Sequence, residues 1–293
     1  MLLRNVAYVT EYTHNDLQNV SRGEVILVHS SGAYLRFGTK VFLLCDQRWG
    51  ALPIGITVDR FSDVIRMLKL EVGQPVTQSG NLLQFPNGCV QLVVRQLIQA
   101  PCRNLPQPHL IRQAAEELAL HNKTGGLSMM VQPLVLGHPC DAALLEKPYF
   151  QRAYQSFSAL IQAMMEPNFD AVEGNVRSLL GLGTGLTPSA DDIFMGMLYI
   201  FCRLHQRDIL SVSLFQMLIE KLSCTHTNQI SASYLKAILH GAPFDPMERV
   251  YQGICGAEPL NIEELMQIGS NSGSEMLLGM LIALSICRYD MIE

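Results

Sequence analysis

The chain has 293 residues, of which 48% are hydrophobic and 16% are charged, and its formal net charge is −5 at pH 7. This acidic balance, with no cluster of Lys and Arg, argues against a nucleic-acid-binding protein. No apolar run reaches the roughly 18 residues that would span a bilayer. We therefore expect a cytoplasmic protein with neither a nucleic-acid partner nor a membrane partner.

The high apolar content predicts large buried helices or a substantial subunit interface, which leaves a homo-oligomer open. The eight cysteines have no Cys-x-x-Cys spacing. This pattern favours buried thiols over a structural metal site.

Residues 1–104 are expected to form a β-rich, barrel-like domain. Its β-prone runs are separated by small polar turns, and Asn87-Gly88 is a strong short hairpin signal. Several short strands at this spacing favour a small barrel or a curled sheet. The expected strands are 5–11, 24–29, 33–37, 40–45, 54–58, 81–84 and 89–95, and a helix is expected over 58–70.

Residues 105–293 are expected to form a mostly α-helical domain that carries a glycine-rich loop. Two prolines within 100–107 mark the expected linker, after which the hydrophobic period becomes helical. The fold class is therefore α+β, with the two halves segregated along the chain. The expected helices are 109–122, 147–165, 169–180, one from the loop to about 203, 208–224, 229–240, 247–253, 262–268 and 274–288.

The stretch 180–198 reads LGLGTGLTPSADDIFMGML and predicts a glycine-rich loop that leads into a buried helix. Thr187 before Pro188 has the order of a helix N-cap followed by a first-turn proline. Asp191 and Asp192 fall in the first turn, where the helix dipole favours negative charge. Free backbone N–H groups at such a helix start suit an anion such as a phosphate or a carboxylate.

This stretch has an internal repeat 83 residues later, where residues 272–281 echo residues 189–198. Both copies have the Ser-x-x-Asp/Glu spacing of a capping box. One interpretation is that both are simply well-capped helix starts. The other is that two equivalent buried helices pack together with their N-termini converging on one pocket. Gly196 and Gly279 would then allow close backbone approach, because glycine within a helix is otherwise unfavourable.

The loop is neither a Walker A sequence nor a dinucleotide fingerprint, so its glycine spacing alone does not identify a ligand. The two aspartates would repel a bare anion. They either cap the helix, hold Mg²⁺ that bridges to a phosphate, or accept hydrogen bonds from an amide or amine of the ligand. Asp192 is the better candidate for the pocket and for a metal, because the repeat has an acid, Glu275, at the same place.

We assign no catalytic residue from the sequence; His226, near a helix start, is a weaker candidate. No cofactor is certain beyond the Mg²⁺ alternative. The candidate ligand-binding residues lie on the two repeated segments and on one polar helix between them. They are Gly183, Thr184, Gly185, Leu186, Thr187, Ser189, Asp191, Asp192, Ser231, Tyr234, Ser270, Asn271, Ser272, Gly273 and Glu275.

The string GTGLTPSADDIFMG at 183–196 resembles the signature G-x-G-L-T-P-S-x-D-D-x-x-x-G of a bacterial family long labelled a domain of unknown function. One branch of that family is the AllH-like subunit of oxamate carbamoyltransferase. Two further segments are similar to family motifs: SASYL at 231–235 with Gly241, and GSNSG at 269–273 with Gly279. Ser270 and Asn271 replace the His-Thr of the family, and Glu275, Thr184 and Ala190 are further departures.

The resemblance implies a subunit of a carbamoyl- or acyl-transfer complex that works beside an acyl-CoA-synthetase-like subunit. The implied reaction links carbamoyl phosphate, oxamate, oxalurate and phosphate. On this interpretation the paired helix N-termini bind a small phosphate- or carboxylate-bearing ligand. The alternatives are a non-catalytic ligand-sensing or assembly subunit, and a stand-alone carboxylase- or ligase-type enzyme.

Overall fold

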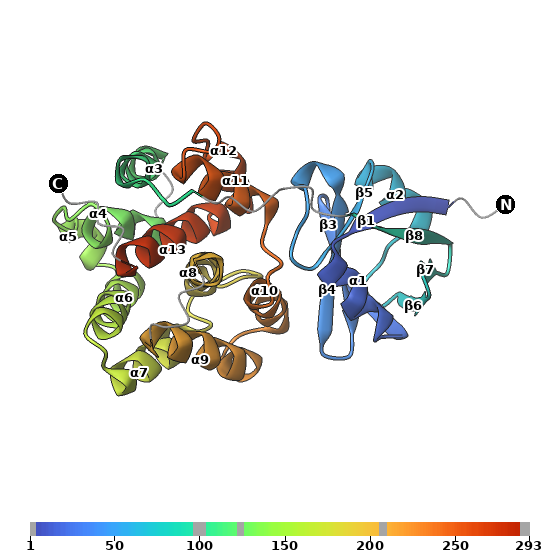
Figure 1. Cartoon of the computed structure of the whole chain (residues 1–293). Helices are drawn as coiled ribbons and strands as arrows, with labels where there is room; N and C mark the ends of the chain where they lie inside the picture. The colour runs from blue at the N-terminus through green and yellow to red at the C-terminus, as the bar shows by residue number, and fades with distance from the viewer. Residues whose placement is uncertain (1–3, 96–103, 122–125, 205–209, 288–293) are drawn as a thin grey trace. The chain divides into compact units, whose positions relative to one another are not determined.

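The computed structural model describes residues 4–95, 104–121, 126–204 and 210–287 (Figure 1). Its internal contacts divide the chain into two units. One consists of Met1–Ala100 with Ala242–Asp245, and the other consists of Pro101–Gly241 with Pro246–Glu293. Part of the expected linker, residues 100–103, lies outside the described residues, and the boundary at residue 104 stays a prediction.

The first unit is a closed barrel with the strand order β1-β5-β4-β3-β2-β6-β7-β8, which confirms the barrel-like prediction. The pairs β1–β8 and β4–β5 are parallel, and the other neighbouring strands are antiparallel. The strands are β1 Arg4–Val9, β2 Arg22–His29, β3 Gly32–Phe37, β4 Lys40–Asp46, β5 Gly55–Val58, β6 Pro75–Ser79, β7 Leu82–Phe85 and β8 Gly88–Val94. Helices α1 (Glu11–Gln18) and α2 (Phe61–Leu68) and the 3₁₀ turn η1 (Gln47–Trp49) complete this unit.

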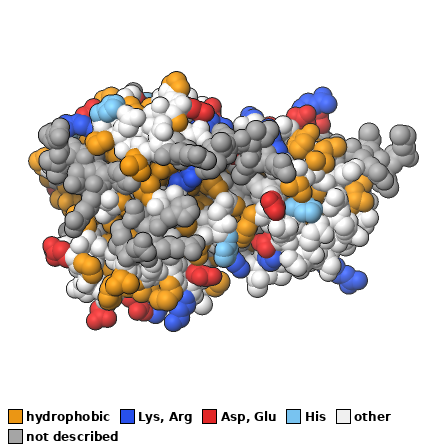
Figure 2. Space-filling view, in the orientation of Figure 1, with side chains coloured by type: hydrophobic (Ala, Val, Ile, Leu, Met, Phe, Trp, Pro, Cys, Tyr) orange, Lys and Arg blue, Asp and Glu red, His pale blue; other side chains and the backbone are white. Residues whose placement is uncertain are grey.

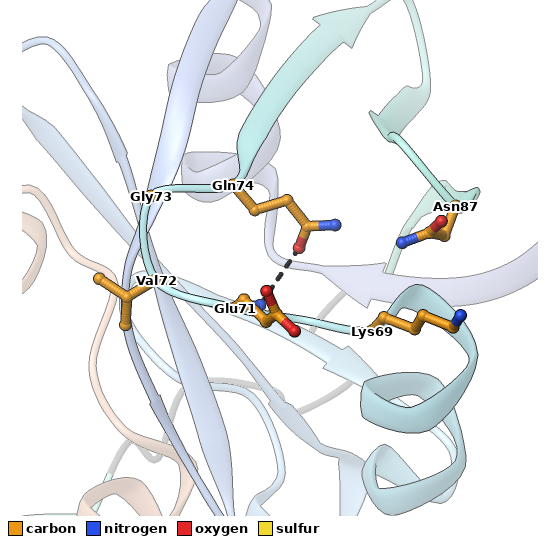
Figure 3. A pocket seen from close by; sticks show the side chains of 6 residues that line it. All are labelled: Lys69, Glu71, Val72, Gly73, Gln74 and Asn87. Atoms are coloured by element: carbon orange, nitrogen blue, oxygen red, sulfur yellow. Dashed lines mark hydrogen bonds between the residues drawn. The ribbon is translucent and has the colours of Figure 1, made fainter.

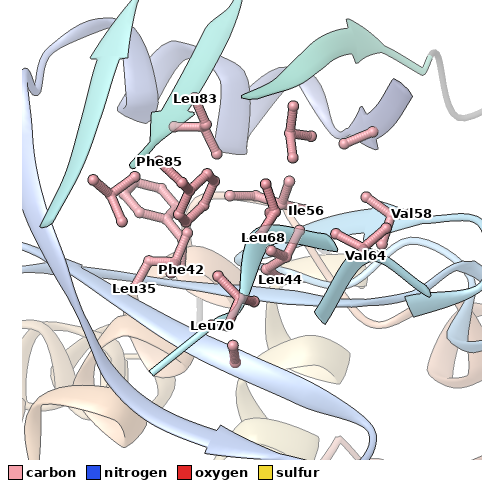
Figure 4. Close-up of a cluster of buried hydrophobic side chains, with 14 of the residues drawn as sticks. Leu35, Phe42, Leu44, Ile56, Val58, Val64, Leu68, Leu70, Leu83 and Phe85 are labelled. Atoms are coloured by element: carbon pink, nitrogen blue, oxygen red, sulfur yellow. The ribbon is translucent and has the colours of Figure 1, made fainter. Parts of the chain in front are cut away.

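The barrel interior is filled by aliphatic and aromatic side chains (Figure 4). Leu35, Phe42, Leu44 and Ile56 from the strands pack with Leu68 of α2, and all five are buried. An eight-stranded barrel is just wide enough to be filled in this way. The barrel is therefore a packed core rather than a channel.

Helix α1 and strand β6 of the barrel unit were not predicted from the sequence. Helix α1 is capped at its N-terminus by Thr10, whose side chain accepts a hydrogen bond from the Thr13 amide, but only Thr13 and Leu17 of the helix are buried. Strand β6 buries Val76 and Gln78, so its inward face is half polar. Both elements have too little apolar periodicity to be recognised. The helix expected over 58–70 is shorter in the structure, since α2 is flanked by Arg60 and Lys69 with positive φ.

The second unit is helical, as expected. Its longer helices are α3 Pro108–His121, α6 Pro148–Met165, α7 Phe169–Leu179, α8 Ser189–Arg203, α9 Leu210–His226, α10 Gln229–Leu239, α11 Asp245–Ile254 and α13 Ser272–Ile286. Short turns of helix are η2 Leu127–Met130, α4 Val131–Leu134, α5 Ala142–Leu145 and α12 Glu263–Met266. In Figure 1, α8 and α13 lie inside the unit with the other long helices around them.

Helices α8 and α13 form the centre of this unit. Every residue of α8 from Ala190 to Phe201 is buried, and so is every residue of α13 from Gly273 to Leu284. Helices that are apolar on all sides belong in the interior of a domain. Within the part of the chain that the structure describes, no helix has both the length and the apolar character needed to cross a membrane. On the face drawn in Figure 2, Lys and Arg side chains are scattered among acidic and uncharged ones.

The two central helices touch backbone to backbone at their glycines. A Cβ atom added to Gly196 would lie 2.0 Å from the carbonyl oxygen of Met276, and one added to Gly279 would lie 1.9 Å from that of Ile193. Met276 is the repeat equivalent of Ile193, just as Gly279 is the equivalent of Gly196. The contact is thus locally two-fold symmetric, and the predicted packing role of the two glycines is confirmed.

Replacing Gly196 or Gly279 by alanine should destabilise the protein by about 1–3 kcal/mol or more, because the new methyl group meets backbone atoms that cannot rotate away. Gly174 in α7 is the matched control, since a Cβ there would meet nothing within 4 Å. Gly174→Ala should stabilise by about 0.5–1 kcal/mol. Chemical denaturation measures all three variants, and a neutral Gly196→Ala would contradict the close contact.

Candidate functional site

The N-terminal ends of α8 and α13 converge. The hydroxyl oxygens of Thr187, just before α8, and Ser272, the first residue of α13, are 3.3 Å apart. Ser189 hydrogen-bonds to Glu275 of the other helix, and Ser272 hydrogen-bonds to Asp192. Because Ser189 and Ser272, like Asp192 and Glu275, are repeat equivalents, the helices exchange the same interaction in both directions.

The caps of the two helices differ from the sequence prediction. The N-cap residues are Pro188 and Asn271, and neither forms a side-chain capping bond. The Pro188 carbonyl accepts from the Asp192 amide at 3.1 Å, and the Asn271 carbonyl accepts from the Glu275 amide at 3.0 Å. The expected Thr187 cap and the two capping boxes are therefore wrong. The hydroxyls of Ser189 and Ser272 interact with carboxyl groups across the helix pair, and the Thr187 hydroxyl donates to the Asp192 side chain instead of to a backbone amide.

The second amide of each helix is bonded to the loop that precedes it. The Ala190 amide donates to the Leu182 carbonyl at 3.0 Å, and the Gly273 amide donates to the Ile268 carbonyl at 3.0 Å. Ala190 and Gly273 are again repeat equivalents. Fewer backbone amides are thus available to an anion than the loop composition suggests.

The loop glycines are required for packing. Gly181 and Gly183 both have positive φ. A Cβ on Gly181 would lie 2.3 Å from the His226 carbonyl oxygen, and a Cβ on Gly183 would lie 2.3 Å from the Ser189 amide nitrogen. The chain therefore folds tightly over the start of α8 and against the end of α9, and only glycine fits these two positions.

Asp191 holds this loop against the neighbouring helices by hydrogen bonds. It is fully buried and accepts hydrogen bonds from the Gly181 amide at 2.8 Å, from the Ser231 hydroxyl at 2.6 Å and from the Thr227 hydroxyl. Burial raises the pKa of Asp191, while these three donors act in the opposite direction. With this many partners, Asp191 and Ser231 hold the loop in place.

Asp192 has a very different environment. It is 1% exposed, and its Oδ2 accepts from the Thr187 hydroxyl at 3.1 Å. Its Oδ1 is buried and has no hydrogen-bond partner among the described residues. Burial and the nearby Glu275 carboxylate raise the pKa of Asp192 well above its ordinary value, and hydrogen bonding from Ser272 and Thr187 lowers it.

Glu275 is the second buried acid of the site. It is 1% exposed and accepts a hydrogen bond from the Leu127 amide at 3.1 Å. Burial raises the pKa of Glu275 to about 6, against the opposing effect of hydrogen bonds from Leu127 and Ser189. The site therefore holds two neighbouring buried carboxyl groups, and the pKa of each is raised by burial.

Two residues of the site were missed by the sequence analysis. Tyr149 at the start of α6 hydrogen-bonds to Ser189, and its pKa is raised by burial and by the charges of Glu275 and Asp192. It is 41% exposed, so it links the buried acids to the surface. Gly126 leaves room for Glu275, whose Oε1 would be 3.2 Å from an added Cβ. Neither residue lies in a motif, and packing alone brings them here.

The structure sorts the predicted residues into groups. One group meets at the helix starts: Thr187, Ser189, Asp192, Asn271, Ser272 and Glu275. Exposed residues of the two loops are Thr184, Gly185, Leu186 and Ser270. Gly273 packs on the carbonyl of Leu265, Tyr234 is buried in α10, and the ring of His226 contacts Thr225.

The converging helix starts also lie in the part of the chain that resembles a known family. The family model described as oxamate carbamoyltransferase subunit AllH matches residues 179–284. Over this segment the chain is AllH-like. The AllH-like segment begins at the end of α7 and ends in α13. It contains α8, all but the last two residues of α13 and every predicted site residue, but not Tyr149. No solved structure matches the chain.

A separate depression lies on the barrel unit (Figure 3). Gln74 Nε2 and Asn87 Nδ2 both donate to the carbonyl oxygen of Leu68, at 3.2 and 3.0 Å. These bonds satisfy the C-terminal end of α2, which explains the polar lining structurally. The lining residues are Lys69, Glu71, Val72, Gly73, Gln74 and Asn87.

The adjacent aspartates should respond oppositely to the same substitution. Asp191→Asn should destabilise by about 1–3 kcal/mol, because the charge that strengthens three hydrogen bonds is removed and the new NH2 group cannot accept. Asp192→Asn should stabilise at pH 8 in the presence of a chelator, because it removes a buried charge next to Glu275. Denaturant unfolding compares them, and two losses of similar size would contradict the assignment.

The acid pair should make stability depend on pH. The pKa of Glu275 is raised from 4.5 to about 6, so the folded state binds this proton more tightly than the unfolded state. Its stabilising effect is fully present below pH 4.5 and is lost as the pH rises through 6, a change of about 2 kcal/mol. In the presence of a chelator, the unfolding free energy of Glu275→Gln minus that of the wild type should therefore increase as the pH rises. A constant difference between the two proteins from about pH 4.5 to about pH 8 would refute this linkage.

Proposed function

We propose that this chain is the ligand-binding subunit of a carbamoyl-transfer complex. Its helical unit binds a small phosphate- or carboxylate-bearing ligand at the converging N-termini of α8 and α13. The observation that carries the proposal is the reciprocal bonding of Ser189 with Glu275 and of Ser272 with Asp192 within the AllH-like segment. A structural repeat that serves packing alone would not need two buried acids at its centre.

The chemistry of the helix starts supports a ligand with acceptor oxygens. The hydroxyls of Thr187, Ser189, Ser272 and Tyr149 gather there. Each carries one O–H, which hydrogen-bonds within this cluster and would turn to an acceptor oxygen of the bound ligand. The two helix dipoles add partial positive charge at the same place.

The carbamoyl-transfer reaction is proposed from the AllH-like segment. The description of the matched family as a subunit favours assembly with other proteins. From the motif resemblance we propose an acyl-CoA-synthetase-like subunit as one of these partners. Carbamoyl phosphate, oxamate and phosphate are accordingly the ligands to test first.

Calorimetric titration of the full chain with carbamoyl phosphate, oxamate and inorganic phosphate, each with and without Mg²⁺, tests the ligand site. Thr187→Val and Ser272→Ala should each lower the affinity about tenfold, the loss of one hydrogen bond worth about 1.4 kcal/mol. Ser285→Ala is the matched control, because that hydroxyl bonds within α13 to the Ile282 carbonyl. Wild-type affinity in both site variants, or no binding of any of the three ligands, would refute the proposal.

A further inference from the structure

We propose that Asp192 and Glu275 together bind one divalent cation, Mg²⁺ or Mn²⁺, that bridges them to the anionic group of the ligand. The cation site consists of this chain's own residues, Asp192 and Glu275. The bridging role of the cation rests on the proposed function.

Asp192 and Glu275 are both buried, and each is surrounded by hydroxyls, amides and other acids. Among the described residues, neither acid forms an ion pair with Lys, Arg or His. The second amide of each helix, which could have faced an anion, is bonded to its own loop. An anionic ligand at this place therefore requires an added positive charge.

Asp192 Oδ1 is buried without a hydrogen-bond partner in the described chain, whereas the adjacent Asp191 carboxylate has three donors. Leaving a buried polar atom unpaired is unfavourable, and native proteins rarely do so without a reason. A cation bound to this oxygen supplies that reason.

The described residues contain no group of three or more His, Cys, Asp or Glu side chains that could hold a metal ion. That excludes, for this part of the chain, a cage of the kind that structural Zn²⁺ uses. Mg²⁺ is typically held by one or two carboxylates, several waters and the phosphate of a substrate. Two carboxylates with hydroxyls of Thr187, Ser189 and Ser272 beside them match this second type.

The test begins with the metal alone. The full chain is treated with chelator, exchanged into metal-free buffer and titrated with MnCl₂ while electron paramagnetic resonance reports free Mn²⁺. We expect one Mn²⁺ bound per chain, competed by Mg²⁺. Binding should be lost in both Asp192→Asn and Glu275→Gln, with circular dichroism confirming that each variant folds.

Glu248→Gln is the matched control. Glu248 is another mostly buried acid of the helical unit, but it pairs with Arg203 and accepts from the Tyr199 hydroxyl. Its loss should leave Mn²⁺ binding unchanged. Wild-type protein that binds no Mn²⁺ would overturn the proposal, and so would unchanged Mn²⁺ binding in Asp192→Asn and Glu275→Gln.

The second step adds carbamoyl phosphate or inorganic phosphate. Binding that requires Mg²⁺ supports the bridge. Ligand binding that is equally tight in chelator would overturn the bridge while leaving the proposed ligand site intact. Mn²⁺ binding without any ligand binding would support the cation site and count against the proposed function.

Discussion

The backbone contact between α8 and α13 at Gly196 and Gly279 is the constraint on which the candidate site depends. The carbonyl oxygens of Met276 and Ile193 lie where any larger residue would place its Cβ. Helices this close bring their first turns together as well. The contact therefore sets the separation of Asp192 and Glu275, and a change at the glycines would move both acids.

The site is electrostatically unfavourable, and the surrounding structure compensates for it. Two buried acids lie near one another with hydroxyl and amide donors as their partners, and one oxygen of Asp192 has none among the described residues. Such an arrangement persists only where the rest of the fold is firmly held. The two all-buried helices and the Asp191 anchor supply that rigidity. Buried acids with raised pKa values that the surrounding fold holds in place are typical of a binding site.

Much of this arrangement could be predicted from the sequence, because the same residue types recur at equivalent positions of the two repeated segments. A glycine at the same position of two apolar helices predicted close packing, and the backbone contacts at Gly196 and Gly279 confirm it. The turns of the barrel could be predicted for a similar reason, since an Asn-Gly pair such as Asn87-Gly88 strongly favours a tight hairpin turn. Local sequence patterns of this kind predict the structure well, because the residue concerned fits only one local structure.

The remaining features depend on partners that are distant in the sequence. Ser189 and Ser272 have the spacing of capping boxes, yet they interact with acids on the opposite helix. Tyr149 and Leu127 reach the site only because α6 and η2 pack beside α13. No periodicity within a single helix encodes such contacts. Helix starts were therefore easier to predict than the bonds that form between them.

The most direct test of this account is a crystal structure of the full chain grown with MnCl₂ and carbamoyl phosphate, with Mn²⁺ located by its anomalous scattering. The account predicts an anomalous peak between the carboxyl groups of Asp192 and Glu275, with the ligand phosphate against Thr187 and Ser272. A ligand bound elsewhere, with these side chains unchanged, would contradict it.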